Sequence, residues 1–151
     1  MKFSTRTLYG LKAILVLASR FGEGSLSASQ IAKKENISVA YLEQILHTLK
    51  KKGFVKSVRG PQGGYTLSKK PSEIPLDSLL YTLVGEASLN GGTHLKNPDE
   101  SDEVSVAYAV FWNLFKSVVD KGLAEKTLKE LIDEARRLKK GKLRPSHSFN
   151  I

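Results

Sequence analysis

The side chains best suited to recognition chemistry lie in one stretch, residues 38–53. Long or polar groups recur there at helical spacing, at Tyr41, Gln44, His47 and Lys51. Because residues three and four apart share one side of a helix, these four would present hydrogen-bonding groups along a single outward face. Such a face can read the edges of base pairs when its helix enters the major groove of DNA. The stretch is therefore interpreted as a DNA recognition helix.

The same stretch also predicts the helix that would position those groups. Ser38 is a suitable N-cap, and Gly53 stands where a helix favours a residue in the left-handed region. The opposite side repeats apolar residues with a period of 3.6 and is expected to pack on a core. These core residues are Leu42, Ile45, Leu46 and Leu49.

Two more helices are expected before this one. The first begins at Ser4 or Thr5 and ends near Gly22 and Gly24. The second covers residues 28–34, since Ser27-Ala28-Ser29-Gln30 has the form of a capping box, and a turn of residues 35–37 follows it. A short helix, a tight turn and a longer helix form the helix-turn-helix plan, although ordinary helical hairpins look similar. The apolar stripe expected on the first helix is Leu8, Leu11, Ile14, Leu15, Ala18 and Phe21.

After Gly53 the sequence period changes from 3.6 to 2. Residues 54–59 and 65–67 have the composition of strands and flank a glycine-rich turn, so they predict a β-hairpin. A hairpin directly after a recognition helix is a wing, whose Arg59 and Gly60 would approach the sugar-phosphate backbone and the minor groove. A plain surface hairpin is one alternative. A phosphate-binding loop is another, but the glycine motifs of nucleotide-binding loops are missing.

The net charge of +9 belongs to the N-terminal half. Residues 1–75 hold thirteen basic and four acidic side chains, whereas residues 76–151 hold eleven of each. This asymmetry predicts a polyanionic partner, double-stranded DNA, for the first half. The alternative is that the basic residues serve solubility.

The second half predicts helices with a different role. Residues 70–75 have the composition of a linker, residues 76–83 form a short amphipathic helix ended by Gly85, and residues 86–101 are expected to be a mobile loop. The next helix, from residue 101 or 102 to about 121, has an apolar face wider than one small domain would cover. It is interpreted as a homodimerisation helix, with a core helix of a monomer as the alternative. The dimerisation face comprises Val104, Tyr108, Phe111, Leu114, Phe115 and Val118.

The predicted fold class is mainly α with a small β-wing. A winged helix-turn-helix DNA-binding domain is expected over residues 1–75, dimerisation and sensor-loop helices over residues 76–140, and a disordered tail over residues 141–151. A last helix is expected over residues 123–139. No apolar run is long enough to span a membrane, so a cytoplasmic location is expected. The absence of cysteine excludes disulfides and thiolate sites, and no catalytic set of side chains suggests an enzyme.

Five motifs of the first half are specific enough to indicate a family. They are Lys2-Phe3-Ser4-Thr5-Arg6, Tyr9-Gly10-Leu11-Lys12-Ala13, Gln30-Ile31-Ala32, Tyr41-Leu42-Glu43-Gln44-Ile45-Leu46 and Val58-Arg59-Gly60-Pro61-Gln62-Gly63-Gly64-Tyr65. Together they closely resemble the Rrf2 (BadM-type) family of bacterial transcriptional regulators, densely over residues 1–85 and afterwards only in the pattern of a long dimer helix. The resemblance implies a homodimeric winged helix-turn-helix repressor or activator that binds a near-palindromic operator.

The resemblance also implies roles for individual residues. Glu43 would discriminate between operator types, since a carboxylate can accept from cytosine N4, and Arg59 would contact the minor groove. Phosphate contacts, which position the protein without reading sequence, would come from Thr5, Ser29 and Lys50. The base-reading surface would be Ser38, Val39, Ala40, Tyr41 and Gln44.

The chain departs from the cluster-sensing members of this family. Their iron–sulfur cluster is held by three cysteines in the loop that corresponds to residues 86–101, and this chain has none. No thiolate-ligated cluster and no other cofactor are therefore expected. One histidine and four carboxylates near this loop could bind a divalent metal, but a solvated acidic surface is expected instead. These residues are His94, Asp99, Glu100, Asp102 and Glu103.

Other signals could replace a cluster. One family member, which regulates cysteine metabolism, binds a biosynthetic enzyme, so a partner protein docked on the long helix is one alternative. A small molecule in a pocket between the dimer helix and the DNA-binding domain is another. Non-specific, architectural DNA coating is a third alternative, for which competitor DNA would compete as well as an operator.

Overall fold

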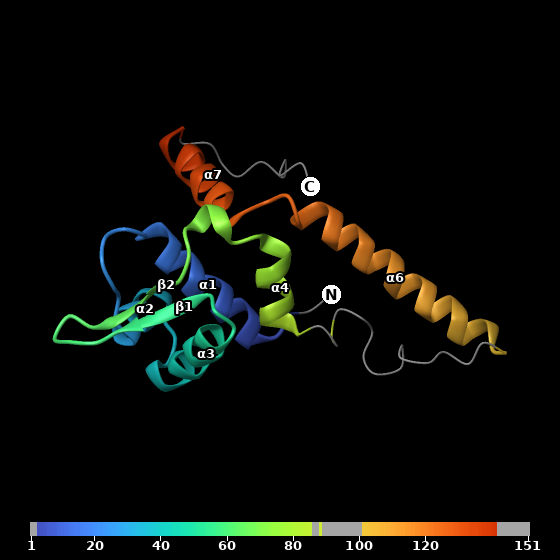
Figure 1. The fold of residues 1–151 in the computed structure, drawn as a ribbon, viewed down its shortest axis with the longest axis horizontal. Helices are drawn as coiled ribbons and strands as arrows, with labels where there is room; N and C mark the ends of the chain where they lie inside the picture. Colours follow the sequence, from blue (N-terminus) through green and yellow to red (C-terminus); the bar gives the residue numbers. More distant parts are fainter. Residues whose placement is uncertain (1–2, 86–87, 89–100, 142–151) are drawn as a thin grey trace.

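The computed structural model describes residues 3–85, 88 and 101–141. The fold is mainly α with one two-stranded antiparallel sheet, which is the predicted winged helix-turn-helix class (Figure 1). The elements in chain order are α1 (Thr5–Ser19), α2 (Ala28–Glu35), α3 (Val39–Lys51), β1 (Val55–Val58), β2 (Gly64–Leu67), the 3₁₀ helix η1 (Pro71–Glu73), α4 (Leu76–Val84), α6 (Glu103–Leu123) and α7 (Leu128–Lys140).

Serine caps begin the first three helices, as the sequence predicts. The hydroxyls of Ser4, Ser27 and Ser38 each accept a hydrogen bond from the backbone N–H three residues further on, at 3.1–3.2 Å. Between α2 and α3, Asn36 adopts a left-handed conformation with φ 53°, which lets the chain reverse within a few residues. Gly53 has φ 82° after α3, as predicted for a residue that ends a helix.

One buried cluster joins these helices. The four apolar residues predicted for the inner side of α3 are all buried. The stripe predicted for the first helix is partly wrong, since Leu8 is exposed while Val16 and Leu17 are buried, and the exposed Phe21 lies beyond the end of α1. The reason is that α1 lies at the centre of the body and packs against α2, α3, α4, α7 and β2, which moves its buried face away from a simple stripe. Later elements add Ile74, Leu79 and Leu128 to the same cluster.

An isolated β-bridge joins the β-hairpin to the segment before α2. In the sheet, Val55 pairs with Leu67 and Val58 with Gly64. Leu26, which precedes α2, exchanges backbone hydrogen bonds with Tyr65 at 2.7 and 2.9 Å. The turn-side half of β2 is therefore held against the segment before α2, and the Ser25 hydroxyl also donates to the Gln62 carbonyl of the turn at 2.8 Å. The hairpin extends to one side of the body (Figure 1).

The segment predicted as a linker, residues 70–75, is instead part of the body. It contains η1, and the side chain of Ile74 is 2% exposed. Its backbone pairs with the start of the last helix, since Leu128 N–H donates to the Ile74 carbonyl at 3.0 Å and Leu76 N–H donates to Lys126 O at 2.9 Å. Sequence composition missed this pairing because the partner lies about fifty residues further along the chain.

The last helix begins at Leu128 and not at residue 123. Thr127 forms a capping box with Glu130, and α6 continues to Leu123, so residues 124–127 make the turn between the two helices. The helix α6 extends away from the body, with only its C-terminal part near α4 (Figure 1). None of the helices in the described part of the chain has the length and apolar character that crossing a membrane requires.

Two predicted segments lie outside the described residues, apart from Ser88, Ser101 and Gly141. They are the loop of residues 86–101 and the tail of residues 141–151. The domain boundary at residue 75 stays a prediction, and residues from both sides of it contribute to one buried cluster.

Candidate nucleic-acid interface

The outward face of α3 presents polar groups to solvent. Glu43, Gln44 and His47 are exposed, and the four apolar residues on the opposite side are buried. At the start of the helix, Val39 and Ala40 are also exposed. Although the Ser38 hydroxyl accepts from Tyr41 N–H as the N-cap, this bond does not use the hydroxyl's own hydrogen, which can still be donated to a base.

The side chain of Tyr41 is only partly exposed on the outward face of α3. Its ring is half-buried and meets the ring of Tyr9 edge-on, with centroids 5.9 Å apart and planes at 76°. This contact is of the favoured edge-to-face kind and fixes the start of α3 against α1. Helical spacing within α3 could not show it, because Tyr9 lies on another helix.

The wing places Arg59 and Gly60 at an exposed position, next to the strand β1 that contacts α3. Both residues follow β1 directly, and Gly60 has φ 118°, a conformation that side chains with a Cβ rarely adopt. Two residues before Arg59, the Ser57 hydroxyl of β1 accepts a hydrogen bond from Lys50 of α3 at 2.8 Å. Lys50, predicted to contact phosphate, therefore also joins α3 to the wing.

Arg6 belongs to the same surface, although the sequence did not single it out. From the first turn of α1, its guanidinium donates to the Thr48 hydroxyl of α3 at 2.6 Å, and the side chain is exposed. A cation in the first turn of a helix is opposed by the helix dipole, and no acidic residue occupies that turn of α1. The unfavourable charge in the first turn could have indicated from the sequence that Arg6 makes a contact outside α1.

The remaining phosphate candidates are exposed residues of α1 and α2. Thr5 is the first residue of α1, beside Arg6, and Ser29 is on α2, which packs against α3; both are exposed. Basic residues continue around the C-terminal end of α3 and into the wing, where all are exposed: Lys50, Lys51, Lys52, Lys56 and Arg59. A surface of this kind gains binding free energy by releasing counterions from DNA.

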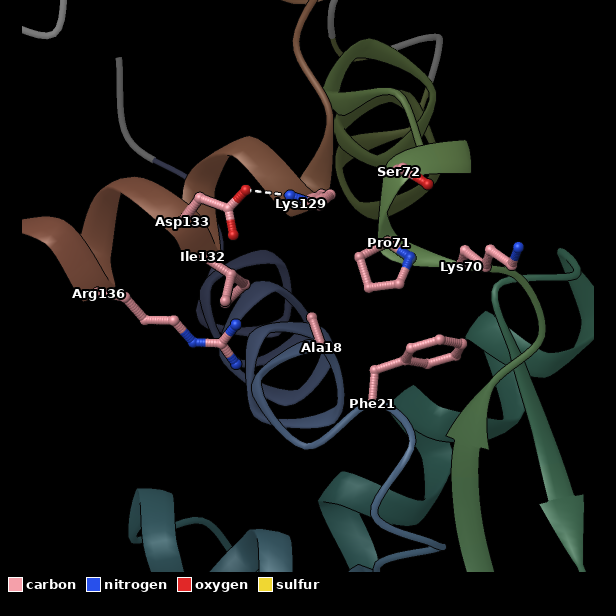
Figure 2. A pocket seen from close by; sticks show the side chains of 9 residues that line it. All are labelled: Ala18, Phe21, Lys70, Pro71, Ser72, Lys129, Ile132, Asp133 and Arg136. Atoms are coloured by element: carbon pink, nitrogen blue, oxygen red, sulfur yellow. Dashed lines mark hydrogen bonds and ion pairs between the residues drawn. The ribbon is translucent and has the colours of Figure 1, made fainter.

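The cavity in Figure 2 differs in place from the expected effector pocket. It has a volume of about 260 Å³ and lies between α1, η1 and α7, not against α6. Three of its polar side chains have partners, since Lys129 pairs with Asp133 and Arg136 donates to Ser19 O at 3.2 Å. The residues that line it are Ala18, Phe21, Lys70, Pro71, Ser72, Lys129, Ile132, Asp133 and Arg136.

Within the described residues, no group of three or more histidine, cysteine, aspartate or glutamate side chains could hold a metal ion. Asp102 caps α6, where its carboxylate accepts from the backbone N–H groups of Val104 and Ser105. Glu103 of the same group is the exposed first residue of α6, and its remaining members, His94, Asp99 and Glu100, lie outside the described residues.

A helix-turn-helix with an exposed polar face and a basic wing defines a DNA-binding transcriptional regulator of the winged helix-turn-helix class. The chain belongs to the Rrf2 family, because residues 3–134 match the family described as "Rrf2: Iron-dependent Transcriptional regulator". It is therefore a transcriptional regulator and not an enzyme.

Similar proteins agree with this assignment. The transcriptional regulator CymR of Bacillus subtilis is 42% identical over 88 residues, which are 58% of this chain and 64% of CymR. The protein Rrf2 of Nitratidesulfovibrio vulgaris is 39% identical over 83 residues, which are 55% of each chain. The chain thus spans less than two thirds of these relatives. A Synechocystis protein named as an HTH-type transcriptional regulator is 36% identical over 136 residues, 90% of each chain.

Solved structures match over more of the length. The structure of T. potens IscR has a TM-score of 0.69 at 34% identity and covers 89% of this chain and 88% of its own. The structure of Bacillus subtilis CymR has a TM-score of 0.67 at 32% identity and covers 89% of this chain and 98% of its own. Both likenesses extend beyond the DNA-binding part into the later helices.

The family's description names iron, and an iron–sulfur cluster would need ligands that this chain must supply. An iron–sulfur cluster is held in proteins chiefly by cysteine thiolates, and the whole sequence contains no cysteine. A thiolate-ligated cluster therefore does not fit this member of the family.

Proposed function

We propose that this protein is a sequence-specific repressor that binds a near-palindromic operator as a homodimer, without an iron–sulfur cluster. The observation that carries the proposal is the exposed polar face of α3, directly opposite four buried apolar residues and beside the basic wing. Occupying the operator would exclude other proteins from the same DNA. Activation is the alternative outcome of the same binding.

In this proposal α3 enters the major groove. Gln44 would read adenine, whose edge matches a side-chain amide, and Glu43 would favour cytosine and oppose phosphate. Arg59 and Gly60 of the wing would approach the adjacent minor groove. The start of the helix, Ser38, Val39, Ala40 and Tyr41, would complete the reading surface. Thr5, Ser29 and Lys50 would contact phosphates and set the register.

The exposed face of α6 supports a homodimer. Val104, Leu114 and Val118 are 75%, 63% and 70% exposed in the protomer. Tyr108 and Phe111 lie on the same face and are exposed, and Phe115 is half-buried. Contiguous apolar surface of this kind is characteristic of an interaction site. A second copy related by a two-fold axis would bury it and place two α3 helices on two half-sites of opposite direction.

The test is selection of bound sequences from random DNA by purified protein with no metal added. A two-fold symmetric consensus is expected, with half-sites one helical turn or a multiple apart. The matched control is Gln44→Ala, which should lose preference at one position of each half-site and keep the symmetry. Enrichment of no consensus, with equal competition by any DNA, would contradict specific binding and indicate an architectural role.

Control by a second molecule is a further candidate, favoured by one observation: the cysteine-free chain cannot carry the cluster that senses for other family members. A partner protein or a small molecule would then supply the signal. Co-purification from cell extract, followed by operator binding with and without the captured molecule, separates this from autonomous binding.

A further inference from the structure

Three side chains connect α4 to α6. The Tyr81 hydroxyl of α4 donates to one carboxylate oxygen of Asp120 on α6, and the Lys116 ammonium donates to the other at 2.7 Å. The same ammonium lies 5.1 Å from the centroid of the Tyr81 ring. Each of the three groups therefore contacts the other two.

Charge makes these contacts stronger than ordinary surface hydrogen bonds. Both bonds end on an ionised carboxylate, and the ammonium adds a cation–π contact. Burial and the hydrogen bond to Asp120 raise the pKa of Tyr81, while the hydrogen bonds from Lys116 and Tyr81 lower the pKa of Asp120. At neutral pH the phenol therefore keeps its proton, the carboxylate keeps its charge, and both bonds are complete.

The position of this cluster controls the direction of α6. The C-terminal end of α6 is already tied to the body, because the turn after it pairs with the first residue of α4, where Leu76 N–H donates to Lys126 O at 2.9 Å. One attachment fixes a point but leaves the helix able to swing. The contact of Asp120 with Tyr81 supplies a second attachment, and two points define an axis.

The body on which α4 rests also carries the recognition helix. On α4, the Leu83 carbonyl accepts from the Thr7 hydroxyl of α1 at 3.1 Å. At Gly10 of α1 an added Cβ would lie 2.5 Å from Leu83 Cδ2, so the two helices are in direct contact there. Because α1 in turn packs on α3, the α4–α6 junction determines how α6 is directed relative to α3.

Because α6 is long, a small change in its angle at this junction displaces its N-terminal end by several ångströms. Val104 lies sixteen residues before Asp120, about 24 Å along a helix that rises about 1.5 Å per residue. A swing of about 10° would move Val104 by about 4 Å, close to the rise of one base pair, about 3.4 Å. The proposed dimer face lies on this part of α6 and would move with it.

We propose that Tyr81, Lys116 and Asp120 are positioning residues that fix the angle between the dimerisation helix and the DNA-binding body. In a dimer formed through α6, this angle sets the separation and direction of the two α3 helices. The three residues would thereby determine which spacing between half-sites the protein accepts. The inference rests on the proposed dimeric operator binding.

The first experiment measures binding to operators that keep both half-sites but change the spacer by one base pair at a time. The unmodified protein should prefer one spacing at least tenfold. Tyr81→Phe, which removes only the hydroxyl, and Asp120→Asn, which removes the charge, should reduce this preference to below threefold. Preference for the half-site sequence should stay the same in both variants. Ser78→Ala, an exposed change one turn away on α4, is the matched control and should behave like the unmodified protein.

The second experiment measures the dimer without DNA. Because the chain has no cysteine, His47→Cys introduces a single spin-label site on each exposed α3 face. The label-to-label distance distribution should be narrow in this parent variant and broader when Tyr81→Phe is added.

Unchanged spacing preference together with an unchanged distance distribution would overturn the proposal. Equal weakening at every spacing, accompanied by a lower unfolding temperature, would also overturn it, because the three residues would then serve stability alone. Absence of any label-to-label distance in the parent would instead refute the proposed dimer, and the spacing role with it. That failure is recognisable because it occurs before the junction is changed.

Discussion

At the scale of single residues, Arg59 is the most direct test of the proposed wing contact. Arg59→Ala should weaken specific operator binding by about 1–3 kcal/mol and relax preference at the flanking base pairs, because an arginine in the minor groove reads groove width and potential. Fluorescence anisotropy on operators with altered flanks measures both effects. Arg59→Lys keeps the charge and is the control for non-specific attraction. Unchanged affinity of Arg59→Ala for every flank would exclude the wing from the interface.

Lys50 can be separated from its neighbour Ser57 by comparing two variants. Lys50→Ala should weaken binding to all sequences alike and lower the slope of log affinity against log salt by about one unit, since one phosphate contact is lost. Ser57→Ala removes the same 2.8 Å hydrogen bond but keeps the ammonium, and should leave the slope unchanged. Equal effects of the two variants would mean that Lys50 serves only to attach the wing to α3.

Sequence reasoning succeeds for residues whose environment is set locally. The caps at Ser27 and Ser38 and the buried inner side of α3 follow from short-range spacing, and all are present. The half-burial of Tyr41 and the contact of Arg6 with Thr48 depend on a different helix, so no local pattern contained them. The site was therefore predictable as a surface, but the contacts that hold it in place were not.

At the scale of elements, the attachment of the wing depends on a glycine. A Cβ at position 64 would lie 2.2 Å from Leu26 O, and this oxygen accepts the 2.7 Å hydrogen bond from Tyr65 N–H. Gly64→Ala should therefore lower the free energy of unfolding by about 2–3 kcal/mol, since backbone on both sides must move. Urea denaturation measures this change. Ser68→Ala, an exposed change just after β2, is the control. A loss below about 0.5 kcal/mol would show that the backbone at the Leu26–Tyr65 bridge can move to accommodate the Cβ at little cost.

Elements were predicted well where one helix or hairpin supplies its own signal. The type and order of α1, α2, α3, the hairpin and α4 all agree with the sequence patterns. Errors occurred at residues 70–75 and at the start of α7, where backbone pairing between distant segments decides the structure. Amphipathic periodicity carries no information about such pairing, because it reports one face of one element.

At the scale of the whole molecule, the proposed dimer depends on the face of α6. Leu114→Glu should abolish it, since a charge buried in an apolar interface without a partner is strongly unfavourable. Leu114 is 63% exposed in the protomer, so the secondary structure of the separated chain should be retained. Light scattering after gel filtration measures the mass, and circular dichroism measures the helix content. Asn113→Glu is the matched control, because helical spacing places this exposed residue on the opposite face.

Operator binding then tests whether a dimer formed through α6 binds both half-sites at once. If α6 joins the two copies, Leu114→Glu should bind a symmetric operator no more tightly than a single half-site, because the second contact is no longer intramolecular. Asn113→Glu should keep the difference between the two DNAs. A Leu114→Glu variant that remains dimeric would place the dimer interface elsewhere, and α6 would then be a surface for another protein. In that outcome the direction of α6 relative to α3 would set where a partner docks and not how far apart two half-sites lie.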